Sequence, residues 1–472
     1  MKNKVSFLLS HFNVLEINKL RKFILSPYFN SNQVLLDLYE ILLKDLDTDR
    51  RKEKSKEAVW KLLYKGKPYD DVRFRKLNSE LLKLVEQYLA QEVYDQNPMR
   101  QSNYLMDAVG KKKITTLYNS TIKNARNIAE KNTKIETSHF YYLYEMESNY
   151  YNIEDFEISR SGKANIENII NNLDQFYFIE KLRWYCTILS RQTNASLNYN
   201  LKFIEEIIDY LNENEFENEL ISIFYSIVQL YLKPDEKQNF YDLQIKVNNS
   251  KEKINDNVLL DIYNHLLNYC ISQGNKGSIE FLDHYININE LLINMGLIFK
   301  DGYLSPWRFK NIVQAALRIN KFDWTEIFIK KNKEFIHPDF RENAVTYNLA
   351  MLFFYQKKYD DVISQLQNVE YEDEAYNLGS KSMLLAVYYE MDYLEPLYSL
   401  FDSFRAYISR NKTLSEARKL SYSNLIKFTR KLSKINTGDT KSIDKLKKDV
   451  SNESNIASDK WLMEKIKEKE NK

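Results

Sequence analysis

Glycine and proline are scarce in this chain, whose 472 residues include 9 Gly and 7 Pro. The two together usually make up about 12 per cent of a globular protein. So few helix breakers leave little room for β-hairpins or glycine-rich loops. Gly66-Lys67 does not form a phosphate-binding loop, because Lys61 stands where that motif needs Gly, and Pro68 follows. We therefore predict an all-α fold with short connections.

Cysteine is also rare, and long apolar runs are missing. Cys186 and Cys270 both lie in expected helices with apolar neighbours, so we predict free, buried thiols rather than a disulfide. The apolar run at 5–9 is too short for the core of a signal peptide. No stretch approaches the roughly 20 apolar residues that span a membrane. We expect a cytoplasmic protein with no membrane partner.

Clusters of residues that carry chemistry are missing as well. The five histidines lie far apart and the cysteines are not paired, so we expect no metal site. No Gly-x-Ser-x-Gly motif or dinucleotide-binding glycine run is present, so we expect no cofactor. Acidic neighbours such as Glu205-Glu206 and Asp360-Asp361 point about 100° apart on a helix. We predict no catalytic residues and no enzyme activity. A site assembled from residues far apart in the sequence remains the alternative.

Residues 305–408 contain a repeat with a period near 34. Most apolar or aromatic positions of one copy recur 34 residues later, and Pro396 is the misfit. The pairs are Leu349 and Met383, Ala350 and Leu384, Phe353 and Val387, Tyr359 and Tyr393, Val362 and Pro396, and Leu366 and Leu400. A looser copy lies 37 residues upstream, at Ile312, Val313, Ala316, Phe322, Thr325 and Ile329. Such a period predicts three helix–turn–helix units, although any antiparallel helix pair gives a similar spacing.

This spacing resembles that of tetratricopeptide repeats, which have an aromatic residue just after the turn between the two helices of each unit. Phe322, Tyr359 and Tyr393 stand at that offset. Departures are Thr346, where the family has a large residue, and Val362 and Pro396, where it has a small one. The resemblance implies stacked antiparallel helix pairs whose first helices line a concave groove.

Turns and shifts in composition divide the chain into four segments. We predict an N-terminal helical module at 1–97, an irregular helical-repeat region at 98–300, tetratricopeptide-like repeats with a capping helix at 301–435, and a polar linker with a tail helix at 436–472. The expected architecture is the N-terminal module followed by an α-solenoid of antiparallel helix pairs, repeat-like at 305–408. The runs Ser26-Pro27-Tyr28-Phe29-Asn30 and Gly66-Lys67-Pro68-Tyr69-Asp70-Asp71 are similar to the start of uncharacterised bacterial helical-repeat proteins, a resemblance that implies no activity.

The leading functional hypothesis is a non-enzymatic scaffold that binds a protein or peptide partner in a concave groove, since stacked helix pairs leave an extended concave surface. The alternative is a nucleic-acid-associated or regulatory protein that uses the basic C-terminal region. Residues 401–472 carry 18 Lys and Arg against 10 Asp and Glu, a net charge of +8. A solvated, lysine-rich helix face is the commoner origin of such charge, so we do not expect nucleic acid to be the partner.

The resemblance to tetratricopeptide repeats also suggests which side chains line the groove. Some members hold a peptide's terminal carboxylate with Lys and Asn side chains, and Lys310 and Asn348 match that pattern. Gln314, Leu378 and Ser382 do not, so we do not expect a complete clamp. We predict a mixed groove that grips an extended or helical segment, because aromatic anchors dominate binding energy. The residues expected on one concave, partly exposed face are Lys310, Asn348, Met351, Tyr355, Lys381 and Tyr388.

Overall fold

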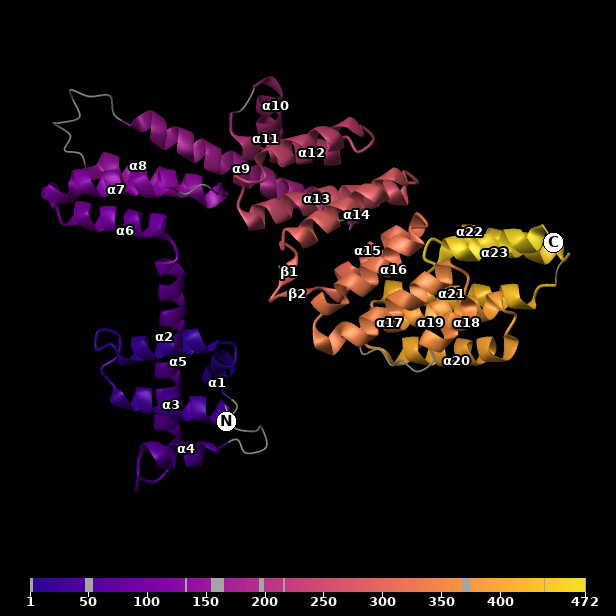
Figure 1. The fold of residues 1–472 in the computed structure, drawn as a ribbon, viewed down its shortest axis with the longest axis horizontal. Coiled ribbons are helices and arrows are strands. Elements are labelled where there is room, and N and C mark those ends of the chain that lie inside the picture. Colours follow the sequence, from indigo (N-terminus) through magenta and orange to yellow (C-terminus); the bar gives the residue numbers. More distant parts are fainter. Residues whose placement is uncertain are drawn as a thin grey trace. The chain divides into compact units, whose positions relative to one another are not determined.

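The chain is almost entirely helical. The computed structural model describes residues 3–46, 54–131, 134–153, 165–194, 199–214, 217–366, 374–436 and 438–471. Within these ranges it contains 23 α-helices and one short β-hairpin (Figure 1). The predicted all-α fold is therefore confirmed, and the stacking of helix pairs into a solenoid stays a prediction. No helix in the described ranges is long and apolar enough to cross a membrane.

The chain divides into two compact units. The first comprises Met1–Leu182 and Glu215–Ile221, and the second comprises Arg183–Asn214 and Ser222–Lys472. Two of the three boundaries between the units fall inside helices, α9 (Ile166–Asn194) and α11 (Glu219–Leu232), and the third falls between Asn214 and Glu215. None of them coincides with the segment boundaries that the sequence suggested near residues 97, 300 and 435.

The N-terminal part of the first unit is organised around one long helix, α5. Its helices are α1 (Lys4–Leu9), α2 (Val14–Leu25), α3 (Gln33–Leu46), α4 (Lys56–Leu63) and α5 (Asp71–Asp95). Asp70 caps α5 by accepting a hydrogen bond from the Arg73 amide at 2.9 Å. The buried side chains of α5 recur at helical spacing and pack against buried Leu20, Tyr39 and Trp60 of the shorter helices.

Three further helices of the first unit follow Asn97-Pro98. They are α6 (Pro98–Lys111), α7 (Tyr118–Lys131) and α8 (Thr137–Ile153), with a 3₁₀ turn at Thr115–Leu117. Asn97 caps α6 through the Arg100 amide, and Pro98 occupies the first turn, where its missing N–H costs nothing. α9 (Ile166–Asn194) begins in this unit and continues into the second.

The second unit continues with helices joined by short connections. In chain order these are α10 (Ile204–Glu213), α11 (Glu219–Leu232), α12 (Gln238–Ser250), α13 (Asp256–Asn275) and α14 (Glu280–Asn294). A hairpin of β1 (Phe299–Lys300) and β2 (Tyr303–Leu304) follows, with Phe299 paired to Leu304. Asp301 and Gly302 both have positive φ in its turn, as a tight two-residue hairpin requires.

The helices of residues 305–408 form three consecutive pairs at the positions expected from the period. The pairs are α15 (Pro306–Arg318) with α16 (Phe322–Asn332), α17 (Pro338–Tyr355) with α18 (Tyr359–Leu366), and α19 (Glu374–Glu390) with α20 (Leu394–Arg410). A 3₁₀ turn at Lys333–Phe335 follows α16. Membership of the tetratricopeptide family stays a prediction.

The three turns within these pairs share one backbone motif. Asn320, Lys357 and Asp392 each have a positive φ, between 55° and 59°. In each turn two amides bond back to the preceding helix; for Lys357 the acceptor is the Phe354 carbonyl, and for Lys358 it is the Phe353 carbonyl. This is the Schellman arrangement, which satisfies the last carbonyls of a helix. Non-glycine residues thus occupy the left-handed positions that glycine takes more often at helix ends.

The C-terminal region differs from the predicted polar linker. α21 (Glu416–Lys434) is followed by α22 (Thr440–Ser451) and α23 (Asp459–Glu470), so most of the expected linker is a helix. One apolar core joins these three helices, made of Phe428, Leu432, Ile443, Leu446, Val450, Leu462 and Ile466. The spacing of Ile443, Leu446 and Val450 was the helical signal, and the surrounding lysines obscured it.

We expect the Lys357→Gly variant to be more stable than the native chain by about 0.5–1 kcal/mol, because glycine adopts the left-handed conformation without steric cost. Lys358→Gly is the matched control, since Lys358 is equally exposed and lies one residue beyond the left-handed position. That change relieves no left-handed strain, so it should not stabilise the protein. Chemical denaturation measures both, and equal shifts of the same sign would contradict the expectation.

Candidate partner-binding cavity

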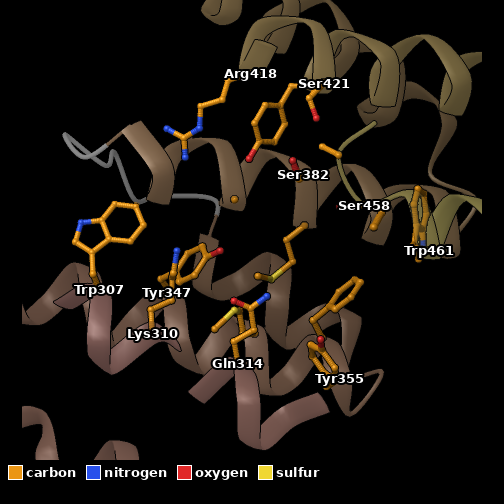
Figure 2. A pocket seen from close by; sticks show the side chains of 17 residues that line it. Trp307, Lys310, Gln314, Tyr347, Tyr355, Ser382, Arg418, Ser421, Ser458 and Trp461 are labelled. Atoms are coloured by element: carbon orange, nitrogen blue, oxygen red, sulfur yellow. The ribbon is translucent and has the colours of Figure 1, made fainter. Parts of the chain in front are cut away.

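The second unit contains a cavity of about 500 Å³. One face each of α15, α17, α19 and α21 lines it, together with the segment that leads into α23 (Figure 2). The lining residues are Trp307, Lys310, Gln314, Tyr347, Met351, Phe354, Tyr355, Gly379, Ser382, Met383, Ala386, Arg418, Ser421, Tyr422, Ala457, Ser458 and Trp461. Ligand pockets in proteins typically enclose about 300–1,000 Å³, so this one is large enough for a small molecule or for a few peptide side chains.

Helical spacing brings these residues to one surface. Side chains three, four or seven positions apart lie on the same face of a helix. Trp307, Lys310 and Gln314 follow that spacing on α15, and Tyr347 and Met351 follow it on α17. The same pattern holds on α19 and α21, so one side of each helix supplies the lining.

One end of the cavity carries its two cationic side chains, Lys310 and Arg418 (Figure 2). The Lys310 ammonium lies 4.2 Å from the centre of the Trp307 ring, a cation–π contact that holds it against the wall. Arg418 Nη1 pairs with Glu374 Oε1 at 2.9 Å, and Thr413 Oγ1 donates to the other Glu374 oxygen at 2.6 Å. Glu374 thus restrains Arg418 and offsets part of its charge.

The middle of the cavity depends on a close approach between α17 and α19. A Cβ atom at Gly379 would overlap the Tyr347 hydroxyl, so only glycine lets that ring lie across α19. Tyr376 packs edge-on against Tyr347 with 4.8 Å between ring centres, and its hydroxyl donates to the Pro306 carbonyl at 3.0 Å. Nearby, the Ser382 hydroxyl has no hydrogen-bond partner within the part of the chain that the structure describes.

The opposite end is aromatic. Figure 2 shows Tyr355 and Trp461 on the side away from Arg418 and Trp307.

Burial raises the pKa of Tyr355, although Arg318 partly offsets the effect. Burial likewise raises the pKa of Tyr422, and Arg418 partly offsets it. Both phenols are therefore neutral near pH 7 and can donate hydrogen bonds to an occupant.

Three of the six residues predicted to share one groove face do line the cavity, namely Lys310, Met351 and Tyr355. Gln314 and Ser382 line the cavity too, although they do not match the residues of the carboxylate clamp.

The other three predicted residues lie elsewhere, so the expectation of one shared face was wrong. Asn348 is fully buried, and its Nδ2 donates to the Ala344 carbonyl at 2.7 Å. The Lys381 ammonium lies 5.6 Å from the centre of the Tyr407 ring, and Tyr388 packs against the core around Phe401. The offsets of the tetratricopeptide family predicted which side of each helix faces the groove. In the structure α17 and α19 present other sides, so Tyr347 and Ser382 face the cavity instead.

Several lining residues were missed by the sequence analysis. Trp307, Tyr347 and Tyr422 belong to stripes with helical spacing, and that spacing was a usable signal. Trp461 belongs to the tail helix, and nothing in the sequence indicates which surface that helix covers.

A second polar cluster lies between α9, α11 and α13, and its residues do not line the cavity described above. Tyr231 Oη and His265 Nδ1 are 2.9 Å apart, and Arg183 Nε donates to Asp261 Oδ2 at 3.0 Å. The Cys186 thiol donates to the Phe224 carbonyl, and burial raises its pKa well above the ordinary value, which leaves it a poor nucleophile. Both cysteines are free and buried, as predicted. Among the described residues, no three His, Cys, Asp or Glu side chains are grouped so that they could hold a metal ion.

Comparisons of this chain with models of protein families, with curated proteins and with solved structures found no match.

The protein should lose stability as the pH falls through about 6.5, and His265 should contribute to that loss. Burial lowers the pKa of His265; Asp261 opposes this effect and Arg183 adds to it. The unfolded chain, with an ordinary histidine pKa of about 6.5, then binds the proton more readily than the folded chain does. The contribution is therefore complete above pH 6.5 and is lost below it.

The test compares denaturation at pH 7.5 and 5.5 for the native chain and for His265→Gln. The variant should lose less stability between the two pH values, even if it starts lower because the Tyr231 contact changes. His11→Gln is the control, because His11 is exposed. An unchanged pH dependence in His265→Gln would contradict the assignment.

Proposed function

We propose that the protein is a non-enzymatic scaffold that binds a segment of a protein or peptide partner in the cavity between α15, α17, α19 and α21. The observation that carries this proposal is the cavity of about 500 Å³ with aromatic and methionine walls. Aromatic side chains dominate the energetics of protein interfaces, and methionine adapts to irregular partners.

The polar groups of the cavity suit a peptide. Serine hydroxyls, tyrosine phenols and the Gln314 amide can form hydrogen bonds with the main chain of a bound peptide, because each peptide residue brings one donor and one acceptor. Apolar partner side chains would fill the aromatic end around Tyr355. The cationic end at Lys310 and Arg418 would accept a polar or acidic group.

The lining supports a binding role rather than a catalytic one. Of the described residues that line the cavity, none is a His, Cys, Asp or Glu, so no imidazole or carboxylate in the lining could activate its serine hydroxyls as nucleophiles. We also propose a cytoplasmic location, which the free thiols of Cys186 and Cys270 support, because oxidising compartments favour disulfides.

Ion pairs weaken the case for a nucleic-acid partner at the basic C-terminal region. Lys431 pairs with Asp449 at 2.8 Å, and Lys447 pairs with Glu470 at 2.7 Å. A phosphate backbone would have to compete with these carboxylates. No observation favours that alternative over peptide binding.

The test selects peptides from a random display library on the purified full-length chain and then measures their affinities by calorimetry. Tyr355→Ala should weaken the selected peptides about tenfold, as the loss of an aromatic anchor does. Tyr393→Ala is the matched control, because Tyr393 is 44% exposed, close to the 37% of Tyr355, and does not line the cavity. It should change the affinity less than about twofold.

Failure to select any peptide would refute the proposed function. Equal effects of the two tyrosine variants would show that the selected peptides bind outside the cavity. Denaturation curves of both variants check that each remains folded.

A further inference from the structure

The connection between α22 and α23 lies against the cavity. Residues 452–461, here called the cover segment, contribute Ala457, Ser458 and Trp461 to the lining (Figure 2). The Ala457 amide donates to the Ser421 carbonyl of α21 at 3.1 Å. Ser421 itself lines the cavity, so the cover segment and the cavity share one helix face.

The contacts of the cover segment with α21 are of the kind that a bound peptide makes. Asn424 Nδ2 donates to the Asn455 carbonyl at 3.0 Å, and Asn455 Nδ2 donates to the Ala417 carbonyl at 2.9 Å. Two of the three bonds, including that of the Ala457 amide, use main-chain groups of the cover segment. Any extended chain could supply such groups, whatever its sequence.

Trp461 anchors the end of the cover segment on α19. Its Nε1 donates to Glu390 Oε1 at 3.0 Å, and its ring packs edge-on against Tyr389 with 5.7 Å between ring centres. Lys465 Nζ pairs with the same Glu390 oxygen at 2.8 Å. The cover segment thus reaches from α21 to the end of α19, across helices that also line the cavity.

The cover segment is more exposed than the helices that flank it, although Ile456, Ala457 and Trp461 pack against the neighbouring cores. None of residues 452–460 is buried, whereas Leu462 and Ile466 of α23 are fully buried. Ser458 has a φ of 54°, a left-handed conformation that is strained for serine. Displacing residues 452–461 would remove the partly buried Ile456 and Trp461 from the apolar core of α22 and α23, but would leave its buried side chains, Leu462 and Ile466 among them, in place.

We propose that the cover segment is a built-in competitor, which occupies part of a longer groove and which an extended partner segment must displace. The proposal rests on the proposed peptide-binding function and adds its regulation. It follows that the native chain favours partner segments short enough for the remaining cavity, and that Trp461 sets this limit.

The test uses the full-length chain and two lengths of a selected peptide: about twelve residues, and the shortest form that still binds. Trp461→Ala should speed amide hydrogen exchange at 453–460. It should also strengthen binding of the long peptide about tenfold, because the competent state becomes more populated. The short peptide should bind no better in Trp461→Ala, because Trp461 itself lines the cavity and its loss only removes contacts there. Trp307→Ala is the control, since Trp307 lines the opposite end of the cavity (Figure 2).

A second variant, Glu390→Gln, loosens the same anchor without removing apolar surface, and it should change exchange and long-peptide affinity in the same directions. If exchange rises in both variants while the long peptide binds no better, the cover segment is a permanent wall and the proposal fails. Unchanged exchange in both variants would also overturn it, because Trp461 would then not hold the segment. If the variants change the binding of long and short peptides equally, the proposal that the cover segment competes with the partner is refuted, and the proposed peptide-binding function stands. If no peptide binds any variant, the proposed function is refuted as well.

Discussion

The three turns at Asn320, Lys357 and Asp392 constrain the helix pairs on which the cavity is built. Each turn places one residue in the left-handed region and closes two main-chain hydrogen bonds onto the preceding helix. These bonds fix where the first helix of a pair ends and in which direction the second begins. The strain of a non-glycine residue is tolerated because the helix would otherwise end on unsatisfied carbonyls.

With the helix ends fixed, packing between successive pairs decides which side chains face inward. Gly379 is the clearest instance, because its lack of a Cβ lets the Tyr347 ring lie against α19. The result is a lining that is cationic at one end and aromatic at the other. Lys310 and Arg418 are both restrained, one by the Trp307 ring and the other by Glu374, so the cationic end is partly preorganised for an occupant.

The ion pair between Lys465 and Glu390 positions the C-terminal helices. Lys465 is 8% and Glu390 16% exposed at the side chain, so both groups lose most of their hydration. Burial alone lowers the pKa of Lys465, but hydrogen bonds to Glu390 and Glu468 outweigh it and raise the pKa above its ordinary value. A buried pair of this kind adds little net stability, because desolvation offsets the attraction. Its geometric effect is clearer, since Glu390 also accepts the Trp461 hydrogen bond and so holds the indole beside the cavity.

The sequence by itself determined the fold class and the places of the helix pairs. Scarce Gly and Pro exclude most other folds, and the offset of 34 between Tyr359 and Tyr393 located two of the three turns to within a residue or two. Free, buried Cys186 and Cys270 could also be predicted, because local apolar neighbours indicate burial.

Only the tertiary structure decided the rotation of each helix and the surface that the tail covers. The helical period predicts that Tyr347, Met351 and Tyr355 share a face. The contacts with neighbouring helices determine whether that face or the one with Asn348 lines the cavity. Trp461 reaches Glu390 over 71 residues of chain, a pairing that no local pattern encodes. Spacing along one helix is a property of its own backbone, whereas the direction in which it faces is a property of everything packed around it.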